Sequence, residues 1–176
     1  MMGNTTARPS LHVEGVDDQM ALINLLIRHD VGYVLGQPLA KAPPRLPEII
    51  QAKSVEKLVD SIETAVSQAE GRPVGFVLDA DSPIVDRWRQ VRARLERVGV
   101  SAPREAPPAE GFVGDSMKYK TRVGVWLMPD NVRDGKLEDF LLDLIAEGDV
   151  LIGHARAATA EARRLGATFS NPDVVM

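Results

Sequence analysis

The chain has 176 residues, of which 44% are hydrophobic and 26% charged, and its formal net charge at pH 7 is −4. This composition fits one compact domain and excludes a wholly disordered chain, and the acidic balance argues against a general polyanion-coating protein. The absence of cysteine excludes disulfides and thiolate metal sites, and the three histidines are too scattered for a zinc signature. Because the sequence has no membrane-length apolar run and no apolar signal core, we expect a cytoplasmic protein with no membrane partner.

Periodic apolar residues, and the breaks between them, predict alternating strands and helices. Gly71 and Gly99 can end two helices, the first of which Ser54 can cap. Prolines concentrate at residues 36–47 and 103–108, where we expect loops. In chain order, the predicted elements are a strand at 11–13, a helix at 17–29, a strand at 48–51, a helix at 55–70, a strand at 74–78, a helix at 83–98, strands at 111–113 and 123–128, and helices at 136–146 and 150–165.

This order of elements predicts an α/β fold, Rossmann-like, with a mostly parallel central sheet sandwiched by helices. We expect the helix at 17–29 to be largely buried, because its apolar residues cover too wide a band for a surface helix. We divide the chain into a flexible N-terminus (1–10), a main domain (11–146) and a C-terminal helical extension (147–176), whose apolar last residues suggest truncation. The helix at 136–146 should turn five apolar side chains inward: Leu137, Phe140, Leu141, Leu144 and Ile145.

Acidic side chains follow the ends of several predicted strands. Parallel strands bring their carboxyl ends to one edge of a sheet, so we expect these acids to meet there. Crowded carboxylates repel one another and raise one another's pKa, and a bound cation offsets this repulsion. Oxygen donors without cysteine favour one or two Mg²⁺ or Mn²⁺ ions over zinc. Unrelated helix caps and turn residues are the alternative interpretation. The candidates are Glu14, Asp18, Asp79, Asp81, Asp130 and Glu138.

Two motifs follow one another along the chain: Val13-Glu14-Gly15-x-x-Asp18 and, after an apolar strand, Asp79-Ala80-Asp81. In this order they resemble the Toprim domain, which is shared by topoisomerases, bacterial primases, recombination proteins and nucleases of the overcoming-lysogenisation-defect (OLD) type. The segments at 124–131 and 135–140 are similar to uncharacterised bacterial Toprim proteins of the OLD group. The resemblance covers about residues 11–145.

The resemblance implies a metal-dependent nuclease, in which Mg²⁺ or Mn²⁺ promotes phosphodiester hydrolysis of DNA or RNA. Glu14 matches the glutamate that binds metal or acts as general acid or base, and Asp79 and Asp81 match the Asp-x-Asp metal ligands. Asp18 matches the acid one turn after that glutamate, and Glu138 matches a glutamate that completes a second metal site. Asp130 is a further candidate ligand, although a Pro-Asp-Asn turn would select the same residues for backbone reasons.

Basic residues could offset the charge that builds on a scissile phosphate, and the sequence does not choose among Lys118, Lys120, Arg122 and Lys136. The arginines between positions 87 and 97 are more simply the solvated face of a helix. Trp88 and Trp126 lie in apolar patterns typical of a core, and we interpret His12 as structural.

Two other functions remain open. One is a non-catalytic or partner-dependent Toprim module, and because the chain has no GxxxxGK[ST] loop, any ATP-driven step would need an ATPase partner in trans. The other is a receiver-like or phosphatase-like protein in which Asp79 itself becomes phosphorylated, which would leave the Glu14 motif unexplained. Neither Tyr33 nor Tyr119 lies in the context of a topoisomerase nucleophile.

Overall fold

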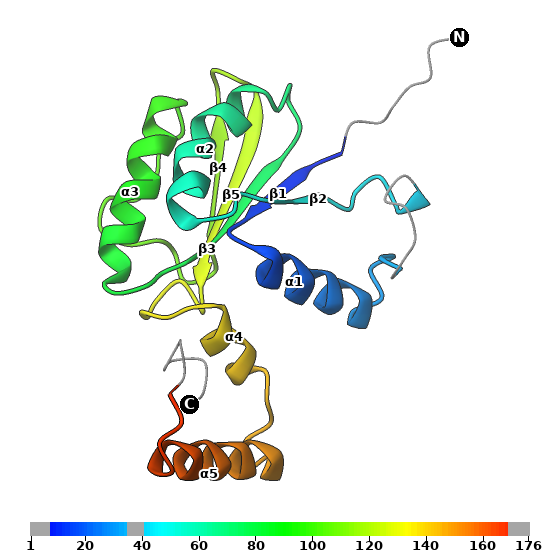
Figure 1. The fold of residues 1–176 in the computed structure, drawn as a ribbon. Helices are drawn as coiled ribbons and strands as arrows, with labels where there is room; N and C mark the ends of the chain where they lie inside the picture. Colours follow the sequence, from blue (N-terminus) through cyan, green and yellow to red (C-terminus); the bar gives the residue numbers. More distant parts are fainter. Residues whose placement is uncertain (1–7, 35–40, 169–176) are drawn as a thin grey trace.

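The centre of the molecule is a five-stranded sheet in the order β2-β1-β3-β5-β4 (Figure 1). The computed structural model describes residues 8–34 and 41–168. β1 pairs in parallel with β2 and β3, β3 pairs in parallel with β5, and β4 is antiparallel to β5. The α/β prediction with a mostly parallel sheet is therefore confirmed. The strands are β1 (Ser10–Val13), β2 (Glu48–Gln51), β3 (Val74–Asp79), β4 (Phe112–Ser116) and β5 (Thr121–Met128).

Helices flank the sheet on both sides. α2 and α3 cover one face, α1 lies against the other face near β1 and β2, and α4 and α5 lie beyond the end where β3 and β5 finish (Figure 1). Among the described residues, no helix is both long and apolar enough to cross a membrane. The helices are α1 (Val16–Arg28), α2 (Val55–Ser67), α3 (Ile84–Arg97), α4 (Leu137–Asp143) and α5 (Val150–Arg164).

The larger core lies between the sheet and the α2–α3 layer. Alternate residues of β3 and β5 meet the apolar stripes of both helices there, as a sheet covered on this face requires. Trp88 is fully buried at its centre, lies edge-on to Phe112 at 5.6 Å between ring centroids and donates from Nε1 to the Pro103 carbonyl at 2.9 Å. The predicted core position of Trp88 is confirmed. His12 stacks on Phe76 on this same face, which agrees with a structural role.

The opposite face has a thinner covering than the sequence predicts. Only Asp18 is buried in α1, so the expected largely buried helix is wrong, because α1 covers the sheet from one side near its edge. α4 ends at Asp143, and of its apolar residues only Leu137 is buried. Leu141 and Leu144 are exposed because α4 meets the sheet through its first turn. Ile145, also predicted to face inward, lies beyond the helix and is exposed.

The two ends of the chain depart in part from the predicted division. Arg8 donates to the carbonyls of Ala42, Pro43 and Leu46, and β1 begins at Ser10, so the end of the predicted flexible N-terminus belongs to the fold. The rest of that segment, residues 1–7, lies outside the described residues. The helix predicted at 150–165 is confirmed as α5, whereas the predicted truncation concerns residues 169–176, outside the described part of the chain.

Candidate functional site

The site forms where β1 and β3 end side by side. His12 pairs with Phe76 across these two parallel strands, so the residues that follow them reach the same edge of the sheet. The backbone N–H of Asp79 donates to Oε1 of Glu14 at 2.8 Å. The two residues that the sequence motifs singled out are thus joined by a direct hydrogen bond across 65 positions of the chain.

Two of the acidic side chains are anchored by backbone amides through one oxygen each. Oδ1 of Asp79 accepts from the N–H of Leu137 at 2.9 Å, which connects the end of β3 to the first residue of α4. Oδ2 of Asp18 accepts from the N–H of Gly15 at 2.9 Å, which satisfies a donor at the start of α1. Backbone amides therefore hold three carboxylates in place, and those of Glu14 and Asp79 each use one oxygen to do so.

Asp81 sits in a connection between two loops. Its backbone has φ = 55°, in the left-handed region, where Asp is among the few residues tolerated. Its N–H donates to the Gly135 carbonyl at 3.0 Å and its carbonyl accepts from the Gly135 N–H at 3.2 Å. The Asp81 carboxylate forms an ion pair with the guanidinium of Arg87. The loop after β3 is thereby fastened to the loop before α4.

Burial and mutual repulsion perturb the acids of this site. Burial is the main cause that raises the pKa of Glu14 to about 7, with smaller contributions from the charges of Asp79 and Asp18. Burial likewise raises the pKa of Asp79 to about 7, and the charges of Asp18, Asp81 and Glu138 add to it. The pKa of Asp18 is raised by burial and, more weakly, by Glu138. Strongly perturbed carboxyls grouped at a sheet edge are typical of functional sites.

Five of the six predicted acids thus belong to one electrostatic cluster: Glu14, Asp18, Asp79, Asp81 and Glu138. Asp130 does not join it. The Asp130 carboxylate accepts from the N–H groups of Val132 at 2.9 Å and Arg133 at 3.0 Å, and these bonds, with the Arg133 charge, hold its pKa below the usual range. Its role is to close the turn after β5, as the alternative interpretation of the sequence predicted. In the part of the chain that the structure describes, no three His, Asp or Glu side chains form a ready-made metal-binding group.

A cleft of about 440 Å³ opens beside Asp81. Ser82 lies in its wall, where its hydroxyl donates to Asp134 Oδ2 at 2.7 Å, while Asp134 Oδ1 accepts from the first N–H of α3 at 2.7 Å. Lys136 contributes a cation to the same cleft. The other lining residues are Gly135, Glu138 and Asp139.

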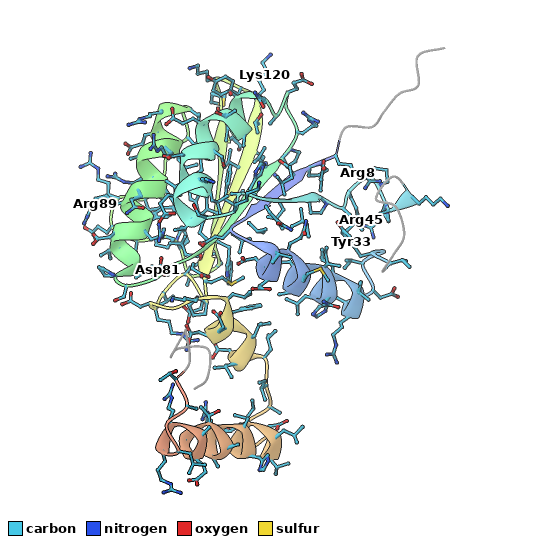
Figure 2. All side chains as sticks on the ribbon, in the orientation of Figure 1. Arg8, Tyr33, Arg45, Asp81, Arg89 and Lys120 are labelled. Atoms are coloured by element: carbon cyan, nitrogen blue, oxygen red, sulfur yellow. The ribbon has the colours of Figure 1, made fainter. Side chains whose placement is uncertain are left out.

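The structure separates the four basic candidates that the sequence left open. Lys118 and Lys120 lie in the turn that enters β5, whereas the other end of β5 pairs with Asp79. An eight-residue strand spans about 23 Å at ~3.3 Å per residue, so these lysines are at the wrong end of the sheet. Figure 2 shows Lys120 and Asp81 at opposite ends. Arg122, near the start of β5, pairs with Asp115, and Lys136 alone of the four lines the cleft.

Arg87 is a site residue that the sequence does not reveal. The charge pattern of α3 predicts that its arginines form a solvated face, which holds for Arg89, whereas the Arg87 side chain is only 11% exposed and reaches the acidic cluster. Helical spacing could not show this, because Arg87 neighbours the buried Trp88 in sequence and reaches the site from the edge of the apolar stripe. The anchoring amide of Leu137 was likewise invisible, since any residue supplies a backbone N–H.

Comparison with known proteins gives one match. No curated protein and no solved structure matches the chain. A family model described as "Protein of unknown function (DUF3226)" matches residues 8–174, which includes the whole sheet, the acidic cluster and α5. The chain belongs to the DUF3226 family.

Proposed function

We propose that this protein is a Toprim-like, Mg²⁺- or Mn²⁺-dependent phosphodiesterase that acts on nucleic acid. The observation that carries the proposal is the 2.8 Å hydrogen bond from the Asp79 N–H to Glu14 Oε1. The carboxylates of Asp18, Asp81 and Glu138 lie close enough to interact electrostatically with Glu14 or Asp79. The order of these residues along the chain, each after the strand that the Toprim resemblance implies, supports it. Ligands of open α/β sheets bind at this edge, beyond the carboxyl ends of the strands.

The donors fit a hard divalent cation. Within the described residues, Oε2 of Glu14 and Oδ2 of Asp79 accept no hydrogen bond, so one oxygen of each carboxylate is available. Mg²⁺ is usually bound by one or two carboxylates and completes its shell with water and substrate phosphate, so a site without three converging side chains suits it. Glu14 and Asp79 would hold the ion, with Asp81 beside them. Asp130 is left out of this set because backbone amides and Arg133 occupy its carboxylate.

The bound ion would polarise the phosphate and lower the pKa of a coordinated water. The chain's own residues would supply the remaining functions. Glu14 would either complete the metal site or move protons; in the second role, its pKa of about 7 in the metal-free protein suits a group that takes up and returns a proton near neutral pH. Lys136 lies where a cation can offset charge on a phosphate in the cleft.

The test is Mn²⁺ and Mg²⁺ titration by calorimetry on the wild-type protein, Asp79→Asn and Glu14→Gln, with cleavage of plasmid and single-stranded DNA and RNA in the same samples. Asp115→Asn is the matched control, because Asp115 is an exposed acid on β4 outside the cluster. We expect metal binding and cleavage in wild type and control, and loss of both in the two site variants. Absence of metal binding in the wild type would refute the proposal.

The same samples distinguish the other two functions. Metal binding without cleavage would favour a partner-dependent or non-catalytic module, and adding an ATPase partner would then be the next step. A beryllium fluoride adduct that requires Asp79 would instead indicate a phosphorylated aspartate. We favour the phosphodiesterase because a phosphorylated Asp79 would leave unexplained the Glu14 carboxylate that is bonded to the Asp79 N–H.

A further inference from the structure

Arg87 brings a positive charge into the acidic cluster from α3. Its Nε donates to the Asp79 carbonyl at 3.1 Å, one terminal nitrogen pairs with Asp81 Oδ2, and the other donates to Gln90 Oε1 at 3.1 Å. The side chain is 11% exposed, whereas that of Asp81 is 42% exposed. Arg87 is therefore held by the fold, and its Asp81 partner is the more accessible member of the pair.

The neighbouring arginine on the same helix has a different environment. Arg89 pairs with Asp86, one turn away, with 68% of its side chain exposed. Figure 2 shows Arg89 on the outer side of α3, directed away from the sheet. The charge of Arg87, in contrast, reaches Glu14, where it opposes the effect of burial. Of these two arginines on α3, Arg87 contacts the acidic cluster and Arg89 does not, so Arg89 is a matched control for Arg87.

We propose that Arg87 is a built-in counter-cation that competes with the divalent metal for Asp81, so that the Arg87–Asp81 ion pair weakens metal binding to Asp81 and its opening strengthens it. The inference rests on the proposed metal-dependent function. Asp81 Oδ2 is occupied by the guanidinium, and a dication bound to the same carboxylate would lie within a few ångströms of a fixed positive charge. Among the described residues Asp81 Oδ1 accepts no hydrogen bond, but two cations that close repel each other, so a metal on this carboxylate binds more weakly while the guanidinium stays paired.

Exposure indicates which partner moves. Arg87 keeps two other bonds, to Asp79 and Gln90, whereas the Asp81 carboxylate is more open to solvent. Rotation of the Asp81 carboxylate therefore transfers it from Arg87 to the metal while Arg87 stays anchored. Arg87 is in this sense a positioning residue: it holds Asp81 in the metal-free protein and sets the metal affinity of the site.

The experiment is Mn²⁺ titration by calorimetry at pH 8, without nucleic acid, on wild type, Arg87→Gln, Arg87→Lys and the control Arg89→Gln. Removing the competing charge in Arg87→Gln should tighten Mn²⁺ binding by about tenfold or more. Arg87→Lys keeps the charge and should stay within about threefold of wild type, as should Arg89→Gln. Circular dichroism melts confirm that each variant is folded, and if Arg87→Gln is unstable, Arg87→Met takes its place, because it also removes the charge while keeping an aliphatic side chain.

A double-mutant cycle assigns the effect to Asp81. In an Asp81→Asn background, Arg87→Gln should no longer tighten binding, because the carboxylate for which the two cations compete is gone. Unchanged or weaker binding in folded Arg87→Gln would overturn the inference and leave the proposed function intact. Tighter binding in Arg87→Gln than in wild type, lost in the Asp81→Asn background, would support the inference, and absence of metal binding in the wild type would overturn the inference together with the proposed function.

Discussion

The raised pKa values at the site predict that the metal-free protein loses stability as the pH rises. At about 1.4 kcal/mol per pKa unit, the rise in Glu14 from 4.5 to about 7 corresponds to about 3 kcal/mol, and the rise in Asp79 from 3.8 to about 7 to about 4 kcal/mol. Both carboxyls are half-buried, so water screens part of this effect, and we expect a combined loss of about 2–4 kcal/mol. The folded state binds these protons more tightly than the unfolded state. The stabilisation is therefore complete below about pH 4 and is lost as the pH passes about 7.

The assay is urea unfolding in EDTA at several values between pH 5 and pH 8. The comparison is Glu14→Gln/Asp79→Asn, whose amides keep the acceptor oxygens without the charge. Burial lowers the pKa of His12, which costs stability as the pH falls, but this contribution is the same in both proteins and cancels in their difference. We expect the variant to be the more stable protein at pH 8 and the gap to close toward pH 5. Parallel curves for the two proteins would refute the electrostatic argument.

Three further substitutions test the fold, each followed by urea unfolding. Trp88→Ala should cost about 3–5 kcal/mol, because it empties the centre of the core and removes the bond to Pro103; a loss below about 1 kcal/mol would contradict the packing. Gly135→Ala should cost about 1–3 kcal/mol, because the backbone has φ = 149° and a Cβ would lie 2.7 Å from Asp139 Oδ2; an unchanged midpoint would show that the loop relaxes. Leu144→Ser should change stability by less than about 0.5 kcal/mol, since Leu144 is 55% exposed; a loss typical of a core residue would show that this face is covered.

Local signals predicted most of the fold because they act within one element. The Ser54 hydroxyl accepts from Lys57 N–H at the start of α2, and Gly99 takes a positive φ directly after the C-cap of α3, as the sequence indicated, whereas α2 already ends at Ser67, before Gly71. The continuous apolar run of β3 identified a strand covered on both faces. The burial of α1 and α4 was overestimated for the converse reason: an apolar stripe shows that a helix can be buried, but the area available depends on where neighbouring elements leave room.

The part of the acidic site that depends on strand order was predictable from the sequence. Glu14 follows β1 and Asp79 is the last residue of β3, and the parallel pairing of these adjacent strands is enough to bring the two residues together. Asp130 also follows a strand, yet the neighbouring Asn131 governs that turn, since Asn131 Oδ1 accepts from Leu127 N–H at 2.7 Å and its backbone is left-handed. An acid at a strand end therefore joins a site only where its carboxylate is not already bound by the backbone of the turn that follows. Arg87 could not be predicted, because its contacts depend on how α3 packs against the sheet and places this side chain beside the end of β3.

The anchoring bonds also bear on why carboxylates occupy these positions. Glu14 and Asp79 each use one oxygen to accept a backbone N–H, a task that the amide oxygen of Gln or Asn performs equally well. A structural role alone would thus be met by the uncharged side chains, without the repulsion that raises both pKa values to about 7. The charge adds nothing to these hydrogen bonds and costs stability at neutral pH; under the proposed function, a cation bound to the second oxygens would convert this cost into binding energy. Stability sacrificed at a cluster of this kind is typical of active sites.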